Sequence, residues 1–387
     1  MTAARFDAAV VGGGLAGRAA AIAVARTGLL TGHLAPAAPP DRRTSALMMP
    51  AVDYLREIGV VADPAALGHP LRQIRIIDAT PRLIRAPETL FTSAEAGLDA
   101  FGWNFANVAL AEAFEAVAAR LPNLTTLPQA ATAIEIADTG ATLSLDGGDV
   151  VEAAFLVGAD GKGSTVRAAA GIGVREHKFD EAALVCDLSL ARPLGDQSVE
   201  FHYPHGPFTL VPAGSTRTNL VWIDERAVLE EAKARGPQAL AGMFRDKSQG
   251  LFGNVDLAGP AFVFPLSTLA VAQAGRNGVV LVGEAAHAFP PIGAQGLNLG
   301  LRDVADLSSA LADADTGKAA WAHDLSNDYA HRRAGDLART GTVVDALFRS
   351  LLGEMLPAQA LRAGGLWALK LVPGLRRQAI AAGMGQR

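Results

Sequence analysis

Three glycines near the start of the chain have the spacing of a phosphate-binding turn. Gly12, Gly14 and Gly17 follow a short apolar run, residues 6–11, and open a segment with a helical pattern, residues 15–26. In such a strand–turn–helix unit the first glycine permits the tight turn and the second lets a pyrophosphate approach the backbone. The third lets the helix pack closely on the strand, while the helix N-terminus faces the negative charge. The spacing, in this context, predicts a dinucleotide-binding site.

An acidic residue that usually accompanies this turn is missing. About 20 residues further on, an Asp or Glu normally binds the adenosine ribose. No acidic residue lies between Asp7 and Asp41, and Ala35 stands near the expected place. Either backbone carbonyls or the side chain of His33 bind the ribose, or adenosine binding is weakened.

A second segment with ligand-binding character lies near the other end of the chain. A buried strand over residues 279–282 would deliver Glu284 to the carboxyl edge of a sheet, where its carboxylate can accept hydrogen bonds from ligand hydroxyls. A loop follows, and the helix expected from about Leu297 would direct its N-terminus at a negatively charged group. The candidate binding residues of this segment are Gly283, Glu284, Pro291, Gly296, Leu297 and Asn298.

Two shorter segments carry further candidates. Arg43 either reaches the pyrophosphate with its planar guanidinium or belongs to a solvated basic loop. Asp160 follows another buried strand and either accepts from the backbone or holds Arg167. Ser164 is expected to cap the helix that begins there.

Longer-range patterns indicate the elements that position these residues. The start of the chain alternates strand and helix, as in a parallel sheet, whereas residues 183–223 show strand-length runs with a turn about every ten residues. Residues 146–148 read as a hairpin turn, residues 44–59 as a helix interrupted by Pro50, and the chain beyond Leu297 as almost entirely helical.

Composition excludes several classes of protein. The chain has 387 residues, half of them hydrophobic, and a net charge of −5, which argues against nucleic acid as a partner. No apolar run is long enough to span a membrane, and the single cysteine, Cys186, is expected to be a buried apolar residue in a reducing cytoplasm. No hydrolase, kinase, metal-site or dithiol motif is present, and no second glycine fingerprint indicates a separate nicotinamide domain.

Together these segments resemble the class A flavoprotein monooxygenases of the para-hydroxybenzoate hydroxylase fold, and among them the ubiquinone-biosynthesis hydroxylases. Residues 41–47 match the family's D-x-R-x-x-A-L segment, residues 157–167 its V-G-A-D-G-x-x-S-x-V-R segment, and residues 283–303 its G-D-A-A-H…Q-G-L-N-L-G-L-R-D segment. Glu284 replaces the family's usual Asp, and the loop over residues 290–296 is more similar to that of the para-hydroxybenzoate enzymes.

The resemblance implies an α/β fold in which a Rossmann-like FAD-binding domain with a parallel sheet is interleaved with a mixed or antiparallel substrate domain, before a helical C-terminus. The expected FAD-binding parts are residues 1–72, 101–180 and 273–335, the substrate-domain parts are residues 73–100 and 181–272, and the C-terminal helical region is residues 336–387.

The resemblance also implies the reaction. FAD would be reduced by NAD(P)H binding transiently, take up O₂ as a C4a-hydroperoxide, and hydroxylate a phenolic ring. It names no catalytic side chain. Phe201, Tyr203, Phe208 and Trp222 are candidates to line the substrate pocket, with core packing as the alternative.

Three functions stay open at this point. The first is hydroxylation of a prenylated ubiquinone precursor, the second is hydroxylation of a soluble phenolic metabolite, and the third is a flavin-binding accessory subunit without turnover. Residues 366–381 either contact a membrane surface or biosynthetic complex, or form a terminal helix packed on the protein's own body.

Overall fold

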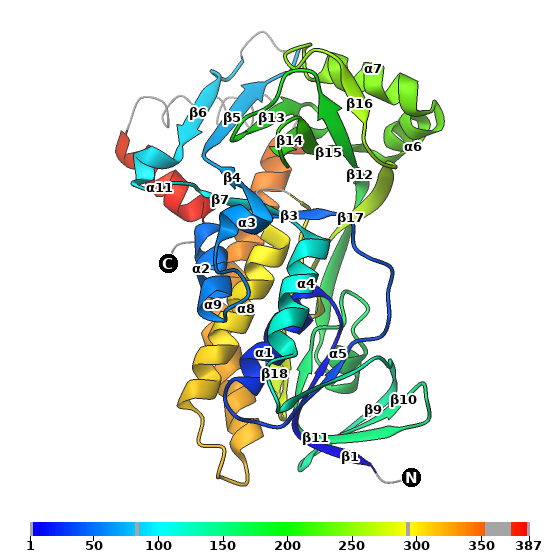
Figure 1. Ribbon diagram of the computed structural model, residues 1–387, viewed down its shortest axis with the longest axis vertical. Coiled ribbons are helices and arrows are strands. Elements are labelled where there is room, and N and C mark those ends of the chain that lie inside the picture. The colour runs from blue at the N-terminus through cyan, green and yellow to red at the C-terminus, as the bar shows by residue number, and fades with distance from the viewer. Residues whose placement is uncertain (1–2, 82–84, 292–294, 353–372, 385–387) are drawn as a thin grey trace.

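Two large sheets, joined by a small third sheet and by long helices, make up the molecule (Figure 1). The structure is a computed structural model and describes residues 3–81, 85–291, 295–352 and 373–384. The combination of a mainly parallel sheet, a mainly antiparallel sheet and a helical C-terminal part confirms the predicted fold class.

The first sheet has the order β18-β19-β11-β1-β2-β8, in which the strands from β19 to β8 are parallel and β18 is antiparallel, with the β9–β10 hairpin added at β11. Its apolar residues 8–11, 155–157 and 279–282 are almost completely buried, as strands covered on both faces require. The strands are β1 (Ala4–Val11), β2 (Thr31–Leu34), β8 (Leu124–Leu127), β9 (Ala131–Ala137), β10 (Gly140–Leu145), β11 (Val150–Gly158), β18 (Gly275–Arg276) and β19 (Val279–Leu281). The predicted turn at residues 146–148 joins β10 to β11 as an antiparallel hairpin.

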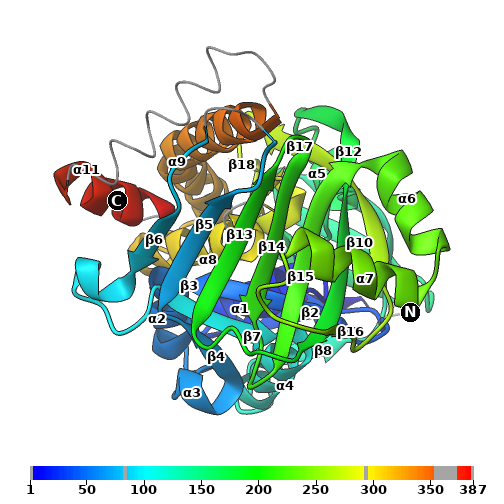
Figure 2. The ribbon, with the colours of Figure 1, turned by 90° about the horizontal axis from the view of Figure 1, so that it is seen from above.

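The second sheet has the order β20-β17-β12-β15-β14-β13-β5-β6, with β16 paired to β12. Its strands are β5 (Gln73–Asp78), β6 (Thr89–Thr92), β12 (Val174–Leu190), β13 (Gln197–Tyr203), β14 (Gly206–Pro212), β15 (Arg217–Glu225), β16 (Val255–Leu257), β17 (Phe262–Val271) and β20 (His287–Ala288). Two helices, α6 (Arg226–Ala234) and α7 (Pro237–Lys247), lie across one face of it (Figure 2). The opposite face is turned toward the third sheet, which consists of β3 (Thr44–Met48), β4 (Gly68–Leu71) and β7 (Gly102–Ala106).

The remaining helices pack on one or another of the three sheets or on each other (Figure 1). They are α1 (Leu15–Ala25), α2 (Met49–Glu57), α3 (Pro64–Leu67), α4 (Asn107–Ala118), α5 (Thr165–Ala169), α8 (Gln295–Asp313), α9 (Trp321–Leu352) and α11 (Pro373–Gly383), with single 3₁₀ turns η1 (Ser93–Ala96) and η2 (Gly283–Ala285). Helix α1 presents alanines to the sheet and to α8, so the helices pack closely. No helix in the described part of the chain is long and apolar enough to cross a membrane.

The expectation of a helix over residues 44–59 is wrong for its first part. Residues 44–48 form β3, which pairs with β7, and the helix begins only at Met49. Pro50 therefore lies in the first helical turn, where its missing N–H costs nothing. Pairing with a strand about 60 residues away overrode the local helical pattern.

The described part of the C-terminal helix packs on the protein's own body. Ile380 of α11 and Met384, just after the helix, are buried against Phe91 and Phe101, and Arg376 pairs with Glu95. This is the second of the two alternatives stated for residues 366–381. The remainder of that stretch, residues 366–372, lies outside the described residues.

Candidate functional site

The glycine turn has the geometry that a pyrophosphate needs. Gly12 has a φ of +130°, and a Cβ there would lie 2.1 Å from the carbonyl oxygen of Ala159. A Cβ on Gly17 would lie 2.0 Å from the carbonyl oxygen of Gly12. Beside Gly14, in contrast, a Cβ would meet nothing within 4 Å, and no side chain caps the N-terminus of α1 there. The chain thus leaves open space at uncapped helix N–H groups, which fits a bound diphosphate.

The side chain of His33 is hydrogen-bonded within this turn and is not available to bind a ribose. Its Nε2 lies 3.0 Å from the carbonyl oxygen of Gly12 and therefore donates to it. Burial lowers the pKa of His33, so the ring is neutral at pH 7. The alternatives that remain for the ribose are backbone carbonyls and weakened adenosine binding.

Glu284 is presented outward by a loop that is fixed on both of its sides. The N–H of Gly283 donates to Asp303 Oδ2 at 2.8 Å, and the carbonyl oxygen of Ala285 accepts from Arg167 Nη1 at 2.9 Å. The Glu284 side chain between these anchors is exposed. A carboxylate held this way at the end of β19 can accept hydrogen bonds from ligand hydroxyls without a cost in ordering the loop.

Arg43, from the N-terminal part of the chain, lies near enough to this carboxylate for the charge of Glu284 to act on it. Its guanidinium donates two hydrogen bonds to the carboxylate of Asp41, each 2.8 Å long. Asp41 also accepts a hydrogen bond from the side chain of Asn107 at 2.8 Å. Burial acts to raise the pKa of Asp41, but hydrogen bonds from Arg43 and Asn107 outweigh it and lower that pKa. The hydrogen bond that Arg43 donates to Asp41 is the main cause that raises the pKa of Arg43, and the charge of Glu284 adds to it. Two loops about 240 residues apart in sequence therefore meet at one place.

Asp160 serves the backbone of the next helix and does not hold Arg167. Its Oδ2 accepts from the N–H groups of Thr165 and Val166, at 2.7 and 3.2 Å. Ser164 caps α5 as predicted, by accepting from the N–H of Arg167. The Arg167 side chain is nearly buried and spans from the carbonyl oxygen of Lys162 to that of Ala285. It thus ties the Asp160 loop to the Glu284 loop.

The start of α8 is joined to β3. Asn298 is buried, its Oδ1 accepts from the N–H of Met48 at 2.8 Å, and its Nδ2 donates to the carbonyl oxygen of Ala46 at 2.8 Å. Gly296 is exposed at the same helix end, and Leu297 is partly buried. Pro291 is exposed just before residues 292–294, which lie outside the described part.

A buried charge network lies behind the Glu284 loop, and residue spacing alone did not identify it. Asp303 of α8 accepts from the Gly283 N–H and from His287 Nε2, the latter at 2.6 Å, and its other oxygen lies 2.6 Å from Arg333 of α9. Arg333 also pairs with two more aspartates at 2.7 Å, and its side chain is completely buried. Those two aspartates are Asp306 and Asp336.

One sequence signal could have indicated this network. Asp303 falls within the apolar stripe of α8, between Leu299 and Leu307, where a charged residue needs a buried partner. The partner is on α9, and the sequence does not specify which residue that is. Helix α9 also supports β19 directly, because Tyr329 donates to the carbonyl oxygen of Leu281 at 2.9 Å.

The aromatic residues expected in the substrate pocket lie on the face of the second sheet that α6 and α7 cover. Phe201, Phe208 and Trp222 are fully buried and pack with Phe244 of α7, while the Tyr203 hydroxyl donates to a backbone carbonyl in the same helix. Figure 2 shows α6 and α7 over this face. The pocket interpretation is therefore wrong for these four residues, and the alternative of core packing describes them.

The opposite face of the same sheet contacts the third sheet beside Arg43. Asn219 of β15 accepts from the Thr44 hydroxyl at 2.7 Å and from Asn104 Nδ2 at 2.8 Å. It also donates to Asp187 of β12 at 2.5 Å. Because Thr44 is the neighbour of Arg43, these contacts place the centre of the sheet directly above the proposed site.

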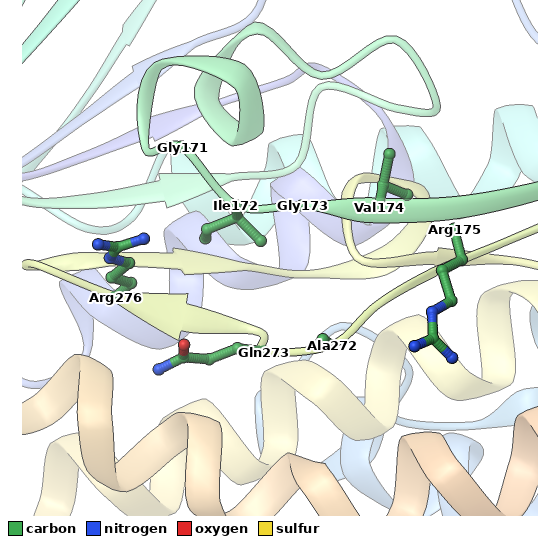
Figure 3. A pocket seen from close by; sticks show the side chains of 8 residues that line it. All are labelled: Gly171, Ile172, Gly173, Val174, Arg175, Ala272, Gln273 and Arg276. Atoms are coloured by element: carbon green, nitrogen blue, oxygen red, sulfur yellow. The ribbon is translucent and has the colours of Figure 1, made fainter.

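A separate cavity of about 350 Å³ lies between the start of β12 and the β17–β18 connection. Arg175 and Arg276 lie at its opposite ends, with Gln273 between them (Figure 3). None of the predicted cofactor-binding residues lines it. The loops that converge on Glu284 and Arg43, and not this cavity, are the candidate functional site.

Similarity to known proteins agrees with this geometry. The model of the family described as FAD binding domain matches residues 5–340. The 3-demethoxyubiquinol 3-hydroxylase of Escherichia coli is 30% identical over 391 residues, covering 98% of each chain. The ubiquinone hydroxylase UbiL of Rhodospirillum rubrum is 30% identical, covering 98% of this chain and 89% of its own length.

Two solved structures are similar to the whole chain. The p-nitrophenol 4-monooxygenase PnpA of Pseudomonas putida aligns with a TM-score of 0.83 at 20% identity and full coverage of both chains. HpxO of Klebsiella pneumoniae, solved with FAD and uric acid, aligns with a TM-score of 0.80 at 16% identity, covering 98% of this chain and 96% of its own. At these identities the two structures confirm the fold and say nothing of the substrate.

Proposed function

Because the chain belongs to the FAD-binding domain family and is an FAD-dependent monooxygenase, we propose that it hydroxylates the aromatic ring of a prenylated phenol in ubiquinone biosynthesis. The observation that carries the proposal is the 30% identity, over 98% of each chain, to an enzyme named 3-demethoxyubiquinol 3-hydroxylase. A ubiquinone hydroxylase from a second bacterium has the same identity over nearly the same span. Both relatives agree with the resemblance drawn from the three motifs.

The described residues fit FAD in the following roles. The uncapped N-terminus of α1 beside Gly14 would hold the diphosphate, with Arg43 adding positive charge nearby. Glu284 would accept from the ribityl hydroxyls, because it is an exposed carboxylate on a rigid loop at the carboxyl end of β19. Gly296 and Leu297, at the start of α8, would place N–H groups and the positive helix end near the pyrimidine part of the ring.

Bound FAD would supply the oxygen-transfer chemistry, with NAD(P)H as the transient reductant and O₂ as the oxygen source. The protein's own task is to hold the phenol ring beside the flavin and to exclude water from it. The second sheet, which lies above the loops through Asn219 and Thr44, supplies the wall for that purpose.

The experiment is a turnover assay on purified protein. We expect yellow protein that oxidises NAD(P)H faster when a prenylphenol is present and that yields hydroxylated product. A strain without the gene should accumulate a quinone precursor. Product from soluble phenols, with normal quinone levels in that strain, would favour the soluble-phenol alternative. Protein that binds no flavin and does not oxidise NAD(P)H would favour the accessory subunit.

A further inference from the structure

The position of the aromatic core shows which side chains of the second sheet lie on its site-facing side. Side chains alternate between the two faces of a strand, and Phe201 of β13 faces α6 and α7. Its neighbours Glu200 and His202 therefore point to the opposite face. Asn219, which accepts a hydrogen bond from Thr44, lies on that same face of the sheet. Its neighbours along β15, Leu220 and Trp222, do not: both belong to the helix-covered core.

A row of partly exposed side chains crosses this face. Strand register aligns Glu200 with Ile76 on one side and with Thr209, Val221, Val185 and Phe262 on the other. Phe262 stacks on Phe264 with ring centroids 6.2 Å apart, and the two rings are 50% and 41% exposed. The side chains of this row are less buried than most of those on the helix-covered face, and its middle members Val185 and Val221 pack against Ala183 and Ile223.

The row is apolar except at its Glu200 end. Valine side chains and two exposed phenylalanine rings suit the ring and apolar tail of a prenylated phenol. Ile76, beside Glu200, and Met48 both pack against the cluster that contains Phe91 and Phe101, and the N–H of Met48 donates to Asn298 at the start of α8. The polar end of the row thus lies close to the helix end assigned to the flavin ring.

Glu200 and His202 form a paired acid and imidazole at this polar end. His202 Nε2 lies 2.5 Å from Glu200 Oε1, with side chains 10% and 22% exposed. Because an ionised carboxylate only accepts, Nε2 carries the hydrogen, and Nδ1 of the neutral ring is left as a proton acceptor. An acid that fixes the tautomer of a histidine in this way makes the other ring nitrogen a base.

We propose that His202 is the base that takes the hydroxyl proton of the phenol, with Glu200 as its positioning residue. The inference rests on the proposed function. The phenol O–H bond breaks, an Nδ1–H bond forms, and the electron pair left on oxygen enriches the ring for oxygen transfer. The Glu200 carboxylate stabilises the imidazolium until the proton passes to water.

Among the described residues, the strand register places one charged side chain directly beside His202. Asp78 of β5 is opposite His202 in the strand register. Its oxygens accept from Thr80 and from the N–H of Ala86, so it is oriented toward that turn. On the other neighbouring strand, β14, Pro207 is opposite and carries no charge.

The test compares His202→Gln and Glu200→Gln with wild-type holoenzyme, using 2-prenylphenol and its ring-fluorinated analogues, which are more acidic. A positioned base contributes roughly 10²–10⁴-fold. We expect His202→Gln to keep FAD and its reduction by NAD(P)H, to lose about 100-fold or more in hydroxylation rate at pH 7, and to release H₂O₂ instead. The more acidic phenols should recover much of that loss. Glu200→Gln, which keeps an acceptor for Nε2–H, should show a smaller loss.

Glu225→Gln is the matched control, because Glu225 forms an exposed pair with His205 on the same sheet, at 3.5 Å. It should behave as wild type. The inference would be overturned if His202→Gln formed hydroxylated product and H₂O₂ in the wild-type ratio and responded to phenol acidity as the wild type does. If His202→Gln does not fold, Glu200→Gln decides by the same criterion. Absence of hydroxylation by wild-type protein with every phenol would instead defeat the proposed function.

Discussion

Replacing Asp303 by Asn should uncouple the Glu284 loop from the helices behind it. All three partners of Asp303 are donors: the Gly283 N–H, His287 Nε2 and a guanidinium nitrogen of Arg333. Asn has the same shape but only one accepting oxygen, so its NH₂ group must face one of these donors. The substitution thus removes a charge and introduces a donor–donor contact in a place that is 1% exposed.

The size of the effect follows from that burial. Breaking a buried ion pair costs about 3–5 kcal/mol, which for a 387-residue chain lowers the melting temperature by about 4–6 °C. One lost hydrogen bond to a charged group at Gly283 is worth about 1.5–3 kcal/mol. If that loss falls on the bound conformation of the loop, FAD affinity should drop roughly 10–100-fold.

Two measurements separate these effects. Quenching of flavin fluorescence gives the dissociation constant for FAD, and thermal unfolding of the apoprotein gives the stability. Asp313→Asn is the control, since Asp313 lies on the same helix in an exposed pair with Arg332 that should contribute less than about 1 kcal/mol. Wild-type FAD affinity in Asp303→Asn would refute the idea that the network holds the loop for the cofactor.

Three further results are expected. Glu284→Gln, which keeps the shape but loses the charge, should weaken FAD binding about 10-fold through weaker hydrogen bonds to the ribityl chain, and an unchanged titration would exclude that contact. Burial raises the pKa of Cys186 to about 12, so the native protein should resist iodoacetamide at pH 8 and react only after unfolding, as mass spectrometry can show. The hydrogen bond from Arg376 lowers the pKa of Glu95 to about 2. Because the pKa of Glu95 is depressed in the folded state, the ion pair stabilises the docked α11 at every pH above the ordinary carboxyl pKa. This stabilisation is lost as the pH falls toward 2. Glu95→Gln keeps the capping box but not the charge and should expose α11 to trypsin at pH 7, whereas equal digestion of both proteins would contradict the assignment.

The sequence determined the features that depend on neighbours in the chain. The turn at Gly12, the hairpin at residues 146–148, the Ser164 cap and the buried strand before Glu284 are local, because each needs only a few consecutive residues of the right type. Their order along the chain also determined the fold class, since strand–helix alternation favours a parallel sheet and closely spaced turns favour an antiparallel one.

Only the tertiary structure decided which face of the second sheet belongs to the site. Alternation along β13 separates Phe201 from His202, but it does not specify which of the two α6 and α7 cover. The commitment of His33 to Gly12, the pairing of β3 with β7 and the choice of Arg333 as partner of Asp303 are likewise long-range. In each case the partner is far away in sequence, and its identity is fixed by packing of whole elements, which no local pattern records.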